Sequence, residues 1–253
     1  MSDTMLTESE SNGAGSKKTK GTLYLIPASL GGDNLDLQIP SGNIMVINKL
    51  DEFIVENERT ARRFLRKSGF KGDFDLVTFK ILDEHTPVNA IPELLEGVDS
   101  GKSIGLLSEA GYPCIADPGN NLVLCAHQKE IKVVPLVGPS SILMALVSSG
   151  FNGQSFVFHG YLPREKGPLV KSLKKIESDA IRNNQTQIFM ETPYRNNSLL
   201  NEILTTCAEE TLLCIASNIT CDDEFIKTMN IRAWKKNMPD LHKKPGIFLI
   251  FRH

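Results

Sequence analysis

The stretch GLLSEAGYPCIADPGNN, residues 105–121, places an unusual loop directly after a short apolar run. Residues 104–107 are apolar and few, as is typical of a buried strand in a parallel sheet. The following loop holds two glycines, two prolines and two acidic residues before the next apolar segment. A plain turn, which is the alternative interpretation, needs fewer of these residue types. The stretch therefore indicates a strand and a helix joined by a loop that has a role of its own.

The same alternation of short β-rich runs and longer helical segments continues on both sides of this stretch. It predicts an α/β protein with two α/β domains, the first with a largely parallel sheet and the second with a mixed one. Strands are predicted at residues 22–26, 44–48, 75–81, 103–107 and 132–136, with helices near 58–68, 88–98, 120–128 and 140–149. After SSGFNG, residues 148–153, strands are predicted at 155–159, 186–191, 211–217 and 246–251, with helices near 168–178 and 197–207. The domains are predicted at residues 21–152 and 153–253.

The composition is that of an ordinary globular protein of 253 residues with a formal net charge of −2. This charge does not indicate a nucleic-acid binder by composition, although a local patch can still bind one. The five cysteines form no Cys-x-x-Cys pair, so neither a disulfide framework nor a zinc site is expected. Free cysteines in this number indicate a reducing compartment. Residues 1–20 are polar and are predicted to be a disordered tail. No apolar run has the length of a bilayer span, so we expect a cytoplasmic protein without a membrane partner.

Three loops are predicted to leave the carboxyl edge of the first sheet, where open parallel sheets bind ligands. They are PASLGGDN at residues 27–34, the loop of the opening stretch, and LVGPSS at residues 136–141. Glycines allow close approach of backbone to a ligand, and a serine at a helix N-terminus can cap it or present amides. The Gly-x-Gly-x-x-Gly fingerprint is absent after the first strand and GxxxxGK[ST] is absent throughout, so a dinucleotide site and an ATP P-loop are not expected.

The loops and their surroundings resemble the tetrapyrrole methylase superfamily of S-adenosylmethionine-dependent methyltransferases, and within it the 16S ribosomal RNA ribose 2′-O-methyltransferases. The resemblance runs through GTLYLIP, VENERTARRFL, LLSEAGYPCIADPG, VVPLVGPSSILMAL, FVFHGYLPRE and FMETPYRNN, and so covers nearly everything except the tail. It implies a homodimer with S-adenosyl-L-methionine in the cleft between the two domains and ribosomal RNA as the partner. The residues that it implies for donor binding are Pro27, Ser108, Glu109, Ala110, Gly111, Pro113, Gly138, Pro139, Ser140, Ser141, Glu191, Pro193 and Gly246.

Several segments depart from the family pattern. Residues 28–32 read ASLGG where Thr-Pro-Ile-Gly-Asn is usual, and Asn57 stands in a segment that usually reads Glu-Asp-Thr-Arg. Ser217 and Asn218 replace the first two residues of an Arg-Glu-Leu-Thr run. These departures bear on the acceptor, and leave two alternatives open: a methylase of a small tetrapyrrole-like acceptor, and a donor-binding or ribosome-associated module without catalysis.

A basic stripe on the helix predicted near residues 58–68 favours RNA independently of the resemblance. Its cations fall on one helical face and Ala61, Phe64 and Leu65 on the other. A solvated face that only promotes solubility is the alternative. The cations are Arg59, Arg62, Arg63, Arg66 and Lys67.

Transfer of a methyl group to a hydroxyl benefits from a base that removes the hydroxyl proton. The candidates are Glu56, which follows the second strand, and Glu84 or His85, which follow the third. For each, a helix cap or a surface polar group is an equally good interpretation. The remaining histidines show no metal-ligand spacing, so no metal is assigned.

Overall fold

The first sheet is wholly parallel and positions the loops of the N-terminal half. The computed structural model describes residues 20–252, so the predicted tail lies outside the described residues except for Lys20. The strand order is β3-β2-β4-β1-β5, and each strand is parallel to its neighbours. The strands are β1 (Thr22–Ile26), β2 (Glu52–Val55), β3 (Thr78–Ile81), β4 (Ile104–Leu107) and β5 (Lys132–Pro135). All five therefore end at one edge, where the three predicted loops begin.

The helices of this half are mostly short, and two larger ones flank the loops. They are α1 (Ser41–Ile47), α2 (Glu58–Lys67), α3 (Ile91–Leu94), α4 (Glu96–Asp99) and α5 (Gly119–Gln128), with 3-10 turns η1 (Leu35–Leu37) and η2 (Val88–Ala90). The Asn57 side chain caps α2 by accepting from the amides of Arg59 and Thr60, which is the usual way to satisfy the free N–H groups of a first turn. Only Glu56 and Asn57 thus separate the end of β2 from the start of α2.

The second sheet is mixed, as the sequence predicted. Its order is β6-β7-β10-β8-β9. Strands β6 and β7 are parallel, and the other pairs are antiparallel. The elements are β6 (Phe156–Tyr161), α7 (Lys166–Asn183), β7 (Thr186–Glu191), α8 (Asn196–Thr206), β8 (Leu212–Ser217), β9 (Phe225–Asn230), α9 (Ile231–Trp234) and β10 (Gly246–Phe251). The predicted fold class, two α/β domains with a parallel and a mixed sheet, is confirmed.

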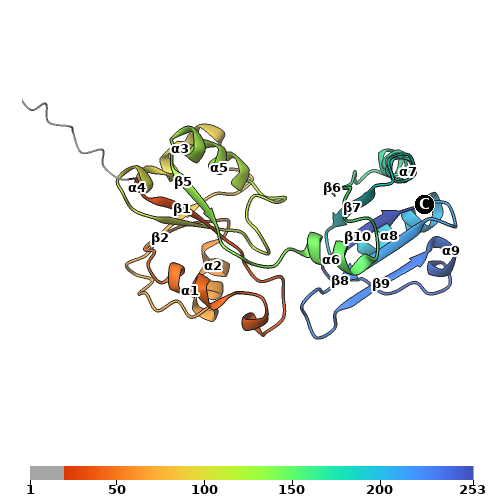
Figure 1. Cartoon of the computed structure of the whole chain (residues 1–253), viewed down its shortest axis with the longest axis horizontal. Helices are drawn as coiled ribbons and strands as arrows, with labels where there is room; N and C mark the ends of the chain where they lie inside the picture. Colours follow the sequence, from red (N-terminus) through yellow and green to blue (C-terminus); the bar gives the residue numbers. More distant parts are fainter. Residues whose placement is uncertain (1–19, 253) are drawn as a thin grey trace, which may run out of the picture.

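Helix α6 (Ser141–Ser149) lies at the junction between the two sheets (Figure 1). Its buried Ala145 and Leu146 belong to an apolar cluster with residues of β7, β8 and β10, and Leu30 from the loop after β1 packs against the same cluster. The helix therefore packs on the second sheet although it precedes the predicted boundary between residues 152 and 153. That boundary stays a prediction.

The predicted strand at residues 44–48 is wrong, because this segment forms α1. Its β-branched residues suggested a strand, but the buried positions are Asn43, Ile47 and Leu50, which have helical and not alternating spacing. The Asn43 side chain also donates to the carbonyl oxygen of Val137 at 2.8 Å. The strand that actually pairs with β4 is residues 52–55, which the prediction missed.

The structure differs from the prediction at one helix, which is interrupted, and at one edge strand, which was not predicted. The helix predicted near residues 88–98 is divided into η2, α3 and α4, since Pro92 and Gly97 are poor helix-interior residues. Strand β9 was missed because FIKTMN alternates weakly and carries a lysine and an asparagine, as edge strands often do. Within residues 20–252, no helix is both long and apolar enough for a bilayer span.

Candidate functional site

The loop after β4 is held in one shape by its own side chains. Asp117 Oδ1 accepts from the amide of Cys114 at 2.7 Å and from the amide of Gly119 at 2.8 Å. Ser108 Oγ donates to the carbonyl oxygens of Ala110 and Gly111. Bonds that close a loop on itself reduce the entropy lost when a ligand binds. The loop is therefore a preformed wall.

Two neighbouring loops are tied to this wall. The amide of Gly138, in the loop after β5, donates to the hydroxyl oxygen of Tyr112 at 2.9 Å. Ala28, in the loop after β1, forms an isolated antiparallel bridge with Gly111. The three loops that the sequence placed at one edge thus form one connected assembly.

The second domain closes the assembly from the opposite side. Leu30 packs against the α6 cluster, and Thr220 Oγ1, beyond β8, lies 3.3 Å from the carbonyl oxygen of Gly31 as a donor. Asn218 and Thr220 both have positive φ, at 49° and 73°. Non-glycine residues in this conformation are strained and cluster at functional sites. The loop after β8 is therefore a second wall with a defined, costly backbone.

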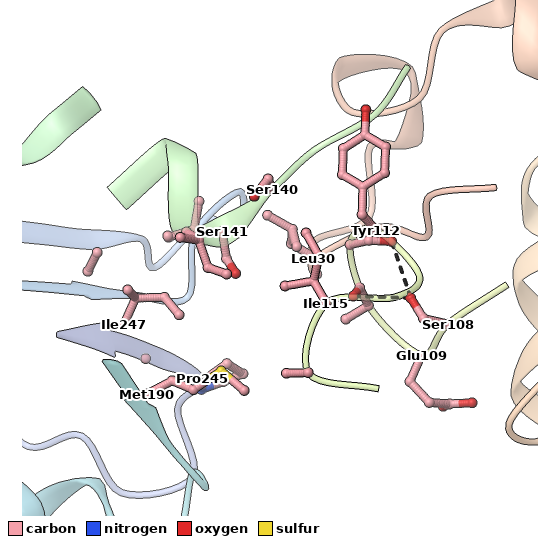
Figure 2. Close-up of a pocket in the computed structure, with 18 of the residues that line it drawn as sticks. Leu30, Ser108, Glu109, Tyr112, Ile115, Ser140, Ser141, Met190, Pro245 and Ile247 are labelled. Atoms are coloured by element: carbon pink, nitrogen blue, oxygen red, sulfur yellow. Dashed lines mark hydrogen bonds between the residues drawn. The ribbon is translucent and has the colours of Figure 1, made fainter. Parts of the chain in front are cut away.

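A cavity of about 460 Å³ lies between these walls, a volume within the range typical of small-molecule sites. Figure 2 shows Ser108, Glu109 and Ile115 on the loop of the first domain facing Met190, Pro245 and Ile247 of the second. The lining also includes the apolar side chains of Ile142, Phe158, Ala216 and Ile219. The cavity thus has one polar, loop-built wall and one mainly apolar, sheet-built wall.

The cavity is acidic. Four carboxyl groups line it, and no lysine, arginine or histidine among the described residues does. The carboxyl groups are those of Glu56, Glu109, Asp117 and Glu191. Such a lining favours a ligand that carries positive charge.

Burial and mutual repulsion perturb the titration of this cluster. Burial, followed by the nearby Asp117 carboxylate, raises the pKa of Glu56 above its ordinary value. Burial also raises the pKa of Asp117, against the opposing effect of its two amide donors. The pKa of Tyr161 is raised by burial and then by Glu191 and Glu56. Perturbed groups gathered in a cleft are typical of functional sites.

Most residues predicted for donor binding line the cavity. Ten of the predicted site residues do so: Glu56, Ser108, Glu109, Ala110, Gly111, Ser140, Ser141, Glu191, Pro193 and Gly246. Pro27, Pro113, Gly138 and Pro139 are not in its lining, and belong instead to the loop framework behind it. Ser140 has a structural task as well, because its Oγ accepts from the amide of Leu143 at the start of α6.

Glu84 and His85, the other two predicted catalytic residues, lie outside the cavity lining. Their side chains are 86% and 82% exposed, with His85 Nε2 3.7 Å from Glu84 Oε1. Glu56 is therefore the one of the three candidates that the fold places in the cavity. Their catalytic roles stay predictions.

The sequence did not single out several lining residues. Tyr112, Ile115, Ala116 and Asp117 lie inside the opening stretch, so its length was the available signal. Phe158 and Tyr161 both line the cavity from β6 although they are three residues apart. The register with β7 shifts between them and Gly160 has a positive φ, so the two-residue strand period does not predict that they share a face. Asn218, Ile219 and Cys221 depend on where β8 ends, and no local pattern marked them. The other unpredicted members are Leu30, Gly31, Ile142, Met190, Ala216, Pro245 and Ile247.

The basic stripe on α2 is divided between packed and unpaired cations. Arg62 pairs with Glu58 at 2.6 Å and lies over the rings of Phe74 and Phe79. Arg66 lies over Phe74 with 4.4 Å between its guanidinium carbon and the ring centroid. Lys67 pairs with Asp33 at 3.1 Å.

Arg59 and Arg63 are exposed. Among residues 20–252, no ion pair involves either of them. These two are therefore the cations of the stripe that remain available to phosphate groups, and the RNA-binding role of the stripe stays a prediction.

The described part of the chain contains no group of three or more His, Cys, Asp and Glu side chains arranged to hold a metal ion. The Cys114 thiol beside the cavity has its pKa raised to about 12, chiefly by burial and then by Asp117. A thiol in this state is not a nucleophile near neutral pH.

Comparison with known proteins places the chain in a family. The model described as Tetrapyrrole (Corrin/Porphyrin) Methylases matches residues 44–234. The chain is 36% identical over 189 residues to ribosomal RNA small subunit methyltransferase I of Streptococcus pyogenes serotype M6, covering 74% of this chain and 61% of that protein. It is 32% identical over 235 residues to the protein of the same name from Vibrio cholerae serotype O1, covering 91% of this chain and 76% of that protein. The chain thus spans about three fifths of the length of the streptococcal relatives.

Solved structures share the fold. The methyltransferase CobJ matches with a TM-score of 0.59 at 16% identity, covering 92% of this chain and 94% of that chain. Uroporphyrin-III-C-methyltransferase from Thermus thermophilus matches with a TM-score of 0.53 at 17% identity, covering 91% of this chain and 92% of that chain.

Proposed function

The chain belongs to the tetrapyrrole methylase family, and we propose that it is a methyltransferase that transfers a methyl group from S-adenosyl-L-methionine to small-subunit ribosomal RNA. The observation that carries this proposal is the acidic interdomain cavity, whose lining combines four carboxyl groups with an apolar wall. The ribosomal target is supported by the names of the relatives, ribosomal RNA small subunit methyltransferase I. A ribose 2′-hydroxyl is the acceptor that the sequence resemblance implies.

The residues of the cavity fit the donor. S-adenosyl-L-methionine carries a positively charged sulfur, an ammonium group and one carboxylate, and its net positive charge is attracted by the carboxyl groups of Glu56 and Glu109. The carboxyl group of Glu191 is already paired with Arg195 at 3.2 Å. Its adenine ring is flat and largely apolar, and suits the wall formed by Phe158 and Ile247. The backbone of residues 110–111, held by Ser108 and by the bridge to Ala28, is available for polar contacts.

Glu56 is the best-placed base. When bound, the donor supplies a methyl group that is electrophilic because it is attached to a positively charged sulfur. Glu56 then receives the proton that the acceptor hydroxyl loses as its oxygen bonds to the methyl carbon, while the bond from that carbon to sulfur breaks and its electron pair remains on the sulfur. A raised pKa suits this role, because a base is most effective when its pKa is near the working pH. Most of the rate still comes from holding the acceptor in line with the methyl group, worth roughly 7–11 kcal/mol in favourable cases.

The charge of the cavity discriminates between acceptors. A tetrapyrrole with several carboxylates would lie inside the cavity against four carboxyl groups of the same sign. An RNA strand instead needs to insert only a ribose, while its phosphates remain outside the cavity, towards α2, where Arg59 stands three residues and Arg63 seven residues beyond Glu56. The geometry thus favours RNA over a small anionic acceptor.

We also infer a homodimer in the cytoplasm. Val137, Leu143 and Val147 are 69%, 50% and 80% exposed, and Leu143 and Val147 are one helical turn apart on α6. Apolar side chains gathered at one surface mark interaction sites. Light scattering of the purified chain, compared with a Leu143→Lys, Val147→Lys variant, tests the dimer: the variant is expected to be monomeric.

Two measurements test the proposed function. Calorimetry with S-adenosyl-L-methionine and its demethylated product is expected to show binding in the micromolar range. Transfer of radiolabelled methyl to a small-subunit ribosomal RNA transcript is then expected to depend on donor and enzyme, with a tetrapyrrole that bears several carboxylates as the small-acceptor comparison. Binding without transfer to RNA would replace the proposal with the small-acceptor or non-catalytic alternative. Absence of binding would overturn the donor assignment itself.

A further inference from the structure

Two tyrosines are exposed beside the mouth of the acidic cavity. Tyr161 ends β6 and is 54% exposed, and Tyr194 follows β7 and is 71% exposed. The two strands are parallel neighbours in which Tyr161 pairs with Met190, so both tyrosines lie at the same edge of the second sheet. Tyr161 and Pro193 line the cavity. The exposed rings therefore adjoin the place where the proposed methyl transfer occurs.

The segments that carry these tyrosines are held together. The ring of Tyr194 meets the ring of His242 edge-on, with centroids 6.1 Å apart. The amide of Lys243 donates to the carbonyl oxygen of Pro193 at 3.0 Å. Arg195 Nη2 donates to the carbonyl oxygen of Arg164 at 3.4 Å and pairs with Glu191 at 3.2 Å. The Tyr194 ring, held in this way, offers a stacking surface at low entropic cost.

Two exposed cations stand on the segments that carry or contact the two rings, whereas no cation lines the cavity within residues 20–252. Arg164 and Lys243 are exposed, and within residues 20–252 neither side chain takes part in an ion pair. Neither cation is needed to satisfy a buried group. We name the group Tyr161, Arg164, Tyr194 and Lys243 the tyrosine platform. It combines the two components by which proteins bind single-stranded nucleic acid, aromatic faces for the bases and cations for the phosphates.

We propose that the tyrosine platform binds unpaired nucleotides of the acceptor RNA next to the methylated ribose, with a base on Tyr194 and phosphates on Arg164 and Lys243. This inference rests on the proposed function and specifies how its acceptor is recognised. A paired strand does not fit, because bases that remain stacked in a duplex expose no face to an aromatic ring. The platform therefore selects RNA whose target region is single-stranded.

Binding of labelled RNA tests the platform separately from catalysis. The probes are a single-stranded RNA with the small-subunit ribosomal sequence and a duplex of the same length, measured by fluorescence anisotropy. Tyr194→Ala is expected to weaken binding of the single strand by roughly 5- to 150-fold, the range for loss of one stacked base. Tyr194→Phe retains the ring and is expected to restore binding. Tyr194 is not in the cavity lining, so donor affinity by calorimetry is expected to stay the same.

A matched pair tests the cations. Lys243→Ala is expected to lower the slope of log affinity against log salt by about 0.7, the contribution of one phosphate contact to a single strand. Lys132→Ala is the control, because Lys132 is also exposed but begins β5, at the opposite edge of the first sheet.

The outcomes separate the platform from the proposed function. Loss of binding in Tyr194→Ala with rescue in Tyr194→Phe supports the platform, whether or not the wild type transfers methyl. Unchanged binding of the single strand in Tyr194→Ala, or an equal loss for the duplex, overturns it. Transfer by the wild type with an insensitive Tyr194→Ala overturns the platform alone. A wild type that binds neither RNA overturns both proposals.

Discussion

The backbones of Ala28 and Gly111 exchange two hydrogen bonds across two loops that are far apart in the sequence. The amide of Ala28 donates to the carbonyl oxygen of Gly111 at 2.8 Å, and the amide of Gly111 donates to the carbonyl oxygen of Ala28 at 3.1 Å. Gly111 has a φ of +69°, and an added Cβ would lie 3.3 Å from Leu30 Cδ2. The residue that bridges the loops is therefore one at which a side chain is strained.

This relationship predicts that Gly111→Val loses both donor binding and stability. A β-branched residue is costly at positive φ, so the free energy of unfolding is expected to fall by about 2 kcal/mol. Loss of donor binding is expected because Gly111 lines the cavity, and the bridge to Ala28 adds the stability cost. Gly111→Asn is the control, since asparagine tolerates this conformation. Denaturation and calorimetry measure the two effects, and a valine variant as stable as the asparagine variant would contradict the strain.

Glu56→Gln is expected to raise the stability of the protein and to lower its affinity for the donor. The pKa of Glu56 is raised in the folded state, chiefly by burial, so the folded protein binds this proton more tightly than the unfolded chain. Ionising the buried Glu56 carboxyl therefore costs stability. This cost is absent below the ordinary carboxyl pKa, grows as the pH rises towards the pKa of Glu56 in the folded protein, and is complete above that folded-state pKa. The variant is therefore expected to have a higher Tm than wild type at alkaline pH, and an equal Tm at strongly acidic pH.

The same substitution removes a negative charge from the donor site. Donor affinity is expected to fall by about tenfold at neutral pH, and wild-type affinity is expected to decline as the pH falls through the raised pKa while the variant stays flat. Glu84→Gln, an exposed carboxyl outside the cavity lining, is the matched control. Equal effects of the two substitutions would remove Glu56 from the site.

The close approach of Gly32 to Thr220 predicts that a side chain at residue 32 would disturb the contact between the two domains. An added Cβ at Gly32, where φ is +70°, would lie 2.4 Å from the carbonyl oxygen of Thr220. Gly32→Ala is therefore expected to push the two loops apart, costing about 1–3 kcal/mol of stability and weakening donor binding. Gly42→Ala in α1, where the added atom has open space, is expected to be neutral or stabilising. Unchanged Tm and donor affinity in Gly32→Ala would show that this contact is dispensable.

The sequence predicted the fold best where a single local pattern decides the structure. Strands at residues 22–26, 186–191 and 246–251 have the predicted bounds, because each is a short apolar run between turn residues. The segment at residues 44–48 was misassigned, since its β-branched content and its burial pattern point to different structures and burial is decided by tertiary packing.

The candidate site divides in the same way. The loop after β4 is continuous in sequence, so its glycines, prolines and acidic residues identified Ser108, Glu109 and Gly111 as candidates. The proximity of Glu56 to Asp117, by contrast, depends on β2 and β4 being neighbours in the sheet. Which strands are neighbours is set by the tertiary fold, and no local stretch of sequence indicates it.

The last prediction concerns α2, where the structure changes which arginines are informative. By sequence spacing Arg62 and Arg66 are the natural pair to replace, but both lie over the ring of Phe74, and Arg66 Nη1 also donates to the carbonyl oxygen of Phe70 at 3.0 Å. Replacing them by alanine is expected to lower the free energy of unfolding by about 1–2 kcal/mol through lost cation–π contacts and packing. A change in RNA binding in that variant would have two explanations.

Arg59→Ala with Arg63→Ala is the cleaner test, because both side chains are exposed. If they contact phosphates, the double variant is expected to keep its Tm and donor affinity while the slope of log affinity for RNA against log salt falls by roughly 1.4, two contacts at about 0.7 each for a single strand. Binding of a small-subunit ribosomal RNA fragment at several salt concentrations measures this slope. A slope identical to wild type would assign the stripe to solubility alone and favour the small-acceptor alternative, since an acceptor inside the cavity does not reach a solvent-facing helix. A shallower slope would place the RNA backbone along α2, three residues from the carboxyl group proposed to receive the proton.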